Sequence, residues 1–94
     1  MMKGVFLMAD DISLSYGQDN AFELLQMLRS DLIGELHAIN DYERHAQMTT
    51  YGPARVLFQD IADDEKHHVA ELLAMIAKFD RRQAEELMRY FHKY

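Results

Sequence analysis

The sequence contains no cysteine, few basic residues and no long hydrophobic run. Without cysteine, neither a disulfide bond nor a thiolate metal site is available to the chain. Lysine and arginine together number 10, against 16 aspartate and glutamate residues, which gives a net charge of −6. This balance argues against a nucleic-acid partner or an anionic membrane surface, and it favours the attraction of cations.

The apolar stretches of the chain are short. The opening Met-Met-Lys-Gly-Val-Phe-Leu-Met-Ala is followed by two aspartates and is too short for a signal peptide. No later run approaches the length of a membrane span, so we expect a cytoplasmic protein. Residues 1–19 show no sustained periodicity and are predicted to form a flexible N-terminal arm, with Met8 as an alternative start of translation.

The length of 94 residues suits one small domain, whose single core is only marginally sufficient. Because disulfides are excluded, reinforcement is expected from oligomerisation or from a metal held by oxygen and nitrogen ligands. The sequence predicts an all-α fold for residues 20–94, with helices over about 20–48, 53–79 and 81–93.

Local signals place the predicted helix ends. Asn20 and Glu23 match a capping box, Pro53 suits the first turn of the second helix, and Asp80 with Gln83 matches the cap of the third. The short turn between the two long helices makes them an antiparallel hairpin.

In each long predicted helix, apolar residues spaced by three or four form a row along one face, called a seam here. In each seam, polar residues occupy positions where the spacing calls for a hydrophobic residue. In the second helix Glu65 and His68 stand in the seam, and in the first helix Glu35 does. An unpaired buried carboxylate is costly, and neither seam contains a lysine or arginine to neutralise it. The seam residues are Leu25, Leu28, Leu32, Ile39, Tyr42 and Ala46 in the first helix, and Phe58, Ile61, Leu72, Met75 and Phe79 in the second.

The hairpin brings these polar residues to one level. Glu35 and Glu65 are each fifteen residues from residue 50, a distance of about 22 Å along a helix. Carboxylates with an imidazole suit iron, manganese or zinc. The alternative is an amphipathic hairpin without a metal site, in which these three side chains lie at the solvent-exposed edge of the apolar seams.

The pattern corresponds to half of a known type of metal site. Four-helix di-metal carboxylate proteins take one glutamate from each of two helices and Glu-x-x-His from each of the other two. This chain supplies one helix of each kind, so we expect two copies to form a four-helix bundle with four carboxylates and two imidazoles. Such a site holds two metal ions.

Three further features of the sequence each allow two interpretations. Tyr42 is either a core tyrosine or a hydrogen-bond donor or electron source beside the metal. His37, Asp41 and His45 share a face and either hold a weak surface metal or are solvated. Gly34 is a tolerated weak point, which costs about 1 kcal/mol relative to alanine, or a point of close approach by another backbone.

The sequence resembles the encapsulated ferritins, a ferritin-like family of two-helix subunits. The motifs are Gly-Glu-Leu-His-Ala-Ile-Asn-Asp-Tyr over residues 34–42 and Asp-Asp-Glu-Lys-His-His-Val-Ala-Glu-Leu-Leu over residues 63–73, and the similarity covers most of residues 24–91. It implies that Glu35, Glu65 and His68 hold a di-iron ferroxidase centre between two subunits. Glu65 would bridge the irons, with Tyr42 nearby and zinc, manganese or calcium as substitutes for iron.

The resemblance also implies a ring-shaped homodecamer built from dimers, acting inside an encapsulin shell that stores the oxidised iron. Two differences from the family stand out. The acids that often form an iron-uptake site are replaced by Gly34 and His37, and the targeting peptide usual after the third helix is not expected because the sequence ends at Tyr94. Either the sequence is part of a longer chain, or encapsulation would occur by fusion or another partner, or not at all.

Two alternative functions fit the same residues. One is a rubrerythrin-like peroxide reductase, which would need an outside electron donor because the chain has no cysteine for a rubredoxin-type site. The other is a non-enzymatic protein that sequesters metal as it assembles. The sequence leaves the oxidant, the ring size and the identity of the bridging glutamate open.

Overall fold

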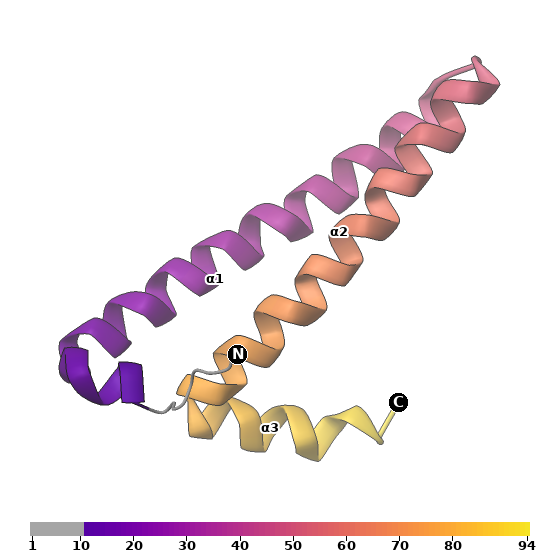
Figure 1. The fold of residues 1–94 in the computed structure, drawn as a ribbon. Coiled ribbons are helices and arrows are strands. Elements are labelled where there is room, and N and C mark those ends of the chain that lie inside the picture. The colour runs from indigo at the N-terminus through magenta and orange to yellow at the C-terminus, as the bar shows by residue number, and fades with distance from the viewer. Residues whose placement is uncertain (1–10) are drawn as a thin grey trace.

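The computed structural model describes residues 11–94, with side chains from residue 20 onward. This part of the chain forms three α-helices, α1 (Asp11–Met48), α2 (Gly52–Phe79) and α3 (Arg81–Phe91). Helices α1 and α2 run antiparallel from a short turn, and α3 turns away from the far end of α2 (Figure 1). The prediction of an all-α hairpin with a short C-terminal helix is confirmed. No helix in this range is long and apolar enough to cross a bilayer.

The first helix begins earlier than the sequence predicted. Helix α1 starts at Asp11 rather than Asn20, so residues 11–19 of the predicted flexible arm are helical. Residues 1–10 of that arm lie outside the described range. The expected capping box falls inside the helix because nothing before it ends a helix. The serines and Gly17 in this segment lower helix propensity without the steric block that a proline would impose.

The turn between α1 and α2 is stabilised by Arg55. Its guanidinium donates hydrogen bonds to the carbonyl oxygens of Ala46 (3.2 Å) and Thr49 (3.1 Å). The last carbonyls of a helix have no partner within the helix, so a side-chain donor from the next helix satisfies them and complements the helix dipole. Pro53 lies in the first turn of α2, as predicted, where a missing N–H costs nothing.

The junction of α2 and α3 is organised by Asp80. Its backbone is extended, and its carboxylate accepts a hydrogen bond of 3.0 Å from the backbone N–H of Gln83, which confirms the predicted cap of α3. The same carboxylate forms an ion pair with Arg29 of α1. Asp80 therefore holds the start of α3 against the hairpin.

Most residues of the two predicted seams are buried or half-buried, although Met75 is 44% exposed, and few side chains of the hairpin are fully buried. Among the described residues, the fully buried hydrophobic side chains are Ala46, Ala62 and Ile76. Many large apolar side chains stay exposed, including Phe22 at 65% and Ile33 at 67%. A single copy thus leaves much of its apolar surface uncovered, and exposed apolar patches of this kind mark interaction sites.

Candidate metal centre

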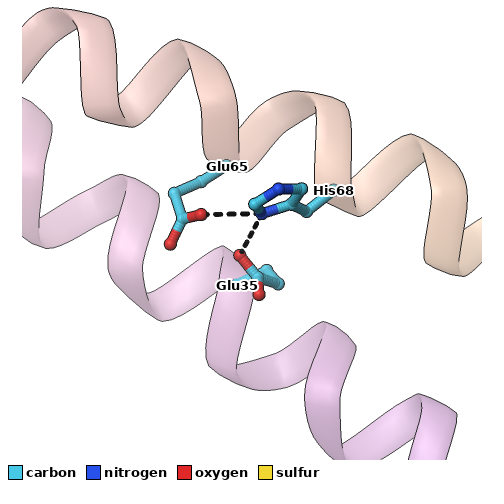
Figure 2. Close-up of side chains that lie close together, drawn as sticks. All are labelled: Glu35, Glu65 and His68. Atoms are coloured by element: carbon cyan, nitrogen blue, oxygen red, sulfur yellow. Dashed lines mark hydrogen bonds and ion pairs between the residues drawn. The ribbon is translucent and has the colours of Figure 1, made fainter.

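The three predicted ligands converge at mid-length on the hairpin. Glu35 comes from α1, and Glu65 and His68 come from successive turns of α2 (Figure 2). One ligand atom from each residue lies within 4.8 Å of the other two. Among the described residues, this is the group of three or more acidic or imidazole side chains with metal-binding spacing. The register predicted from the turn therefore places the three side chains together, as the sequence indicated.

The imidazole of His68 links the two carboxylates. Its Nδ1 lies 2.9 Å from Oε1 of Glu65 and 3.5 Å from Oε1 of Glu35. The hydrogen bond to Glu65, and more weakly the interaction with Glu35, raises the pKa of His68 against the opposing effect of partial burial. A protonated Nδ1 would donate its hydrogen bond to Glu65, the nearer of the two carboxylates.

One carboxylate oxygen in this group lacks a hydrogen bond. Oε1 of Glu35 is buried and forms no hydrogen bond in the chain, and its one polar contact is the ion pair of 3.5 Å with Nδ1 of His68. A buried carboxylate oxygen without a hydrogen bond is costly. A cation between the three side chains would satisfy this oxygen and replace the proton on Nδ1. The donor set of two carboxylates and one imidazole fits iron, manganese or zinc.

A groove opens beside Glu35 and His68. It has a volume of about 510 Å³ and includes Glu35 and His68 in its wall. Ser30, Asp31 and Glu71 also line it, although the sequence alone gave them no role. For Asp31 and Glu71 the signal was spacing, because Asp31 is one turn before Glu35 and Glu71 is one turn after His68. The remaining lining residues are Leu28, Gly34, Leu72 and Met75.

Tyr42 belongs to a separate aromatic group closer to the turn. Its ring centroid lies 6.2 Å from that of Phe58 and 6.2 Å from that of His45, and the rings of His45 and Phe58 are 5.5 Å apart. The side chain is half-buried, and it is absent from the three-residue metal group. These contacts favour a packing role for Tyr42, and its role beside a metal stays a prediction.

The structure does not bring His37, Asp41 and His45 together as the predicted weak surface metal site. Asp41 pairs with Arg44 at 2.8 Å, and His45 packs edge-on against aromatic rings. His37 is exposed one turn before Asp41. His67, which the sequence placed away from the seam, is exposed and lies 3.5 Å from Glu71. Neither group meets the metal-binding spacing found for Glu35, Glu65 and His68 within the described part of the chain.

A glutamate on one helix of a hairpin and Glu-x-x-His on the other are half of the ligand pattern of ferritin-like di-metal four-helix bundles. The crystal structure of the encapsulated ferritin domain from Pyrococcus furiosus has this fold. It superposes with a TM-score of 0.73 and 37% sequence identity, over 78% of this chain and 74% of that one. The chain belongs to the encapsulated ferritin family.

Curated relatives support the same assignment. The ferritin-like-encapsulin shell fusion protein of Pyrococcus furiosus is 38% identical over 71 residues, which are 76% of this chain and 21% of that protein. The encapsulin nanocompartment cargo protein EncC of Myxococcus xanthus is 33% identical over 77% of this chain and 55% of its own length. The chain thus spans about half or less of the curated relatives it matches. None of the known family models matches it.

Proposed function

We propose that this protein is a ferroxidase that oxidises Fe(II) to Fe(III) at a site formed between two copies of the chain. The observation that carries the proposal is the convergence of Glu35, Glu65 and His68 from two helices, with a buried oxygen of Glu35 that forms no hydrogen bond. Membership of the encapsulated ferritin family supports iron as the substrate.

Two copies are needed because one copy offers too few ligands. The three side chains of one hairpin leave most positions around two metal ions unfilled. A two-fold-related copy doubles the set to four carboxylates and two imidazoles, which is the ligand set of the ferritin-like di-iron proteins. The same association would cover apolar side chains that are exposed in one copy, such as Met75 at 44%.

Each residue has a distinct part in the proposed reaction. Glu35 and His68 would bind one Fe(II) ion as terminal ligands, and Glu65 would bridge the two ions, as in the family that the chain resembles. Each Fe(II) gives up one electron, so a pair supplies the two electrons that, with two protons, reduce O2 to hydrogen peroxide. Holding two ions together lets both electrons leave to the same oxidant molecule.

The relatives also suggest where the reaction occurs. Their names describe an encapsulin cargo protein and a fusion to an encapsulin shell. We infer that this protein likewise works with an encapsulin shell in the cytoplasm, as cargo or through a fused shell domain, and that dimers join into a ring such as the decamer of the family. Fe(III) produced at the interface would then be stored by the shell.

Anaerobic titration of the metal-free protein with Fe(II) tests this function. Mass measurement follows the assembly, the binding isotherm gives the stoichiometry, and admission of air starts the oxidation. We expect one Fe(II) per chain and rapid oxidation with oxygen consumption. Tight binding without oxygen uptake would indicate sequestration, and repeated turnover only with peroxide and a reductant would indicate a peroxide reductase.

The control for this titration is the triple variant Glu35→Ala/Glu65→Ala/His68→Ala, which should bind no iron at the interface. Oxidation by this variant at the rate of the unmodified protein would place the reaction elsewhere and exclude the proposed centre.

A further inference from the structure

Lys66 of α2 forms an ion pair with α1 from the same helical turn that carries Glu65 and His68. Its Nζ lies 2.9 Å from Oε2 of Glu43 on α1 and 3.5 Å from Oδ1 of Asp63 on α2. Successive side chains leave a helix about 100° apart, so Lys66 projects to one side of the ligands. The contact with Glu43 therefore joins the two long helices outside the ligand group.

This ion pair lies in a second groove of the hairpin, nearer the turn than the one beside Glu35. The groove has a volume of about 560 Å³, and Glu43 and Lys66 line it from opposite helices. Ala46 of α1 and Ala62 of α2 also line it and are 3% and 1% exposed. Small side chains at a contact let two helices approach closely. Methyl groups interlock weakly, so the alanines limit the distance between the helices more than their sliding.

We propose that Lys66 is a positioning residue of the metal centre, whose ion pair with Glu43 keeps Glu65 and His68 in register with Glu35. The inference rests on the proposed function of these three residues as the metal centre. Lys66 stands between Glu65 and His68 in the chain. Any sliding or rotation of this turn of α2 that moves the two ligands therefore also moves the ammonium group relative to Glu43.

The direction of the ion pair suits this role. Glu43 comes eight residues after Glu35, about two helical turns closer to the loop. Lys66 lies at the level of the ligands, so its side chain reaches along the groove to the other helix. A diagonal link of this kind changes length when the helices slide along each other, and sliding in the direction that lengthens it separates the two charges.

The metal-free protein needs such a contact because its ligands do not hold the register by themselves. Glu35 and Glu65 are carboxylates on different helices, and like charges at this distance repel each other. The attraction between Lys66 and Glu43 opposes this repulsion. A site whose ligands are already in place binds a metal more tightly, because less ordering accompanies binding.

The sign of the effect of Lys66→Met on Zn(II) affinity tests the proposal. Methionine keeps much of the apolar stem and removes the charge. A positive charge close to a cation site repels the cation, so its loss through charge alone would tighten binding. Loss of register would weaken it. The side chains of Lys66 and Glu43 are 52% and 50% exposed, and ion pairs of this exposure are weak, so we expect about two- to fivefold weaker binding.

Two further variants separate position from charge. Lys66→Arg retains the cation and should bind Zn(II) almost as tightly as the unmodified protein. The double variant Glu43→Gln/Lys66→Met removes one charge of each sign and leaves the net charge unchanged. It should nevertheless bind Zn(II) as weakly as Lys66→Met, because the link between the helices is lost in both.

The matched control is Arg44→Met. Arg44 is 58% exposed and pairs with Asp41 at 2.8 Å within α1, so the variant removes a cation without breaking a contact between the helices. Its Zn(II) affinity should be unchanged or slightly higher. Competition with a chromophoric chelator measures the affinity, circular dichroism checks that each variant is folded at the titration temperature, and sedimentation velocity measures association without metal.

The results separate this inference from the proposed function. Folded Lys66→Met that binds Zn(II) as tightly as Arg44→Met would overturn the positioning role and leave the metal centre intact. Weaker association of metal-free Lys66→Met would place Lys66 at an interface between copies and would also overturn it. A triple variant Glu35→Ala/Glu65→Ala/His68→Ala that binds Zn(II) like the unmodified protein would instead exclude the metal centre itself.

Discussion

Glu35 of α1 and His68 of α2 face each other across the hairpin, with 3.5 Å between Oε1 of the carboxylate and Nδ1 of the imidazole. This contact joins the two helices, whereas the contact of His68 with Glu65 lies within α2. The ligand group therefore depends on the register of the hairpin. A shift of α2 by one residue would move its ligands by about 1.5 Å and rotate them by about 100°.

Removal of any of the three ligands should abolish rapid iron oxidation. In the two-fold-related site, Glu35→Ala, Glu65→Ala or His68→Ala each removes two ligands. The loss in rate should exceed the roughly 10- to 100-fold that accompanies loss of an outer hydrogen-bond partner of a metal ligand. Stopped-flow measurement of Fe(III) absorbance after mixing with air-saturated buffer gives the rate.

His67→Ala and His37→Ala are the controls for the ligand series, because both side chains are exposed and lie outside the three-residue group. They should oxidise iron at nearly the unmodified rate. An inactive His67→Ala beside an active His68→Ala would mean that the helical phase of α2 has been assigned wrongly.

Replacement of Tyr42 by phenylalanine should leave metal binding intact. Phenylalanine keeps the ring that packs against Phe58 and His45 and removes only the hydroxyl group. The equilibrium stoichiometry of Fe(II), measured anaerobically, should be unchanged, with at most an altered rate of oxidation. Loss of iron binding in Tyr42→Phe would show that the hydroxyl group takes part in the metal centre.

Ile76 should be the apolar residue of α2 whose truncation costs most. It is 2% exposed and is the largest fully buried side chain among the described residues. Ile76→Ala leaves a cavity as well as losing buried area, so we expect a loss of about 2–5 kcal/mol in the free energy of unfolding. Urea unfolding measures it, with Val56→Ala, at an exposed position, as the near-neutral control.

The seams could be predicted from the sequence because helical periodicity fixes which side chains share a face. The positions of Glu35, Glu65 and His68 followed from this periodicity and from the short turn. The start of α1 was predicted wrongly, since a capping pattern at Asn20 is only a local preference and no residue before it blocks a helix. The surroundings of Gly34 depend on the distance between helices, which periodicity does not determine.

Asp80 should make the stability of the fold depend on pH. The hydrogen bond from the backbone of Gln83, and secondarily the ion pair with Arg29, lowers the pKa of Asp80 below its ordinary value of 3.8. Stabilisation by the charged carboxylate is therefore present above the unfolded pKa and is lost as the pH falls through the folded pKa. The loss should occur below about pH 4.

Two substitutions at Asp80 separate the cap from the charge. An asparagine side chain retains a good N-cap and lacks the negative charge opposite Arg29, so Asp80→Asn should be less stable than the unmodified protein at pH 6 and equal to it well below pH 4. Asp80→Ala should be less stable than Asp80→Asn at both values. A difference between the unmodified protein and Asp80→Asn that stays constant with pH would exclude this origin of the pH dependence.

Metal binding and assembly should be thermodynamically linked. Without metal, dimerisation would bring four carboxylates of Glu35 and Glu65 into a poorly hydrated interface, where like charges oppose association. Two divalent ions reverse this balance and add bonds that join the two chains. Fe(II) under anaerobic conditions, or Zn(II), should therefore shift the protein from monomer toward dimer and larger assemblies in sedimentation velocity.

The ligand variants test whether the linkage between metal binding and assembly arises at these three residues. Glu35→Ala/Glu65→Ala should respond little to metal, yet it should associate at least as well as the unmodified metal-free protein because the repulsion is gone. Some association without metal is expected in all forms, since apolar side chains such as Met75 remain exposed in one copy. If the triple variant Glu35→Ala/Glu65→Ala/His68→Ala assembles with Zn(II) as strongly as the unmodified protein, the linkage arises at another site. The carboxylates would then not lie at the interface.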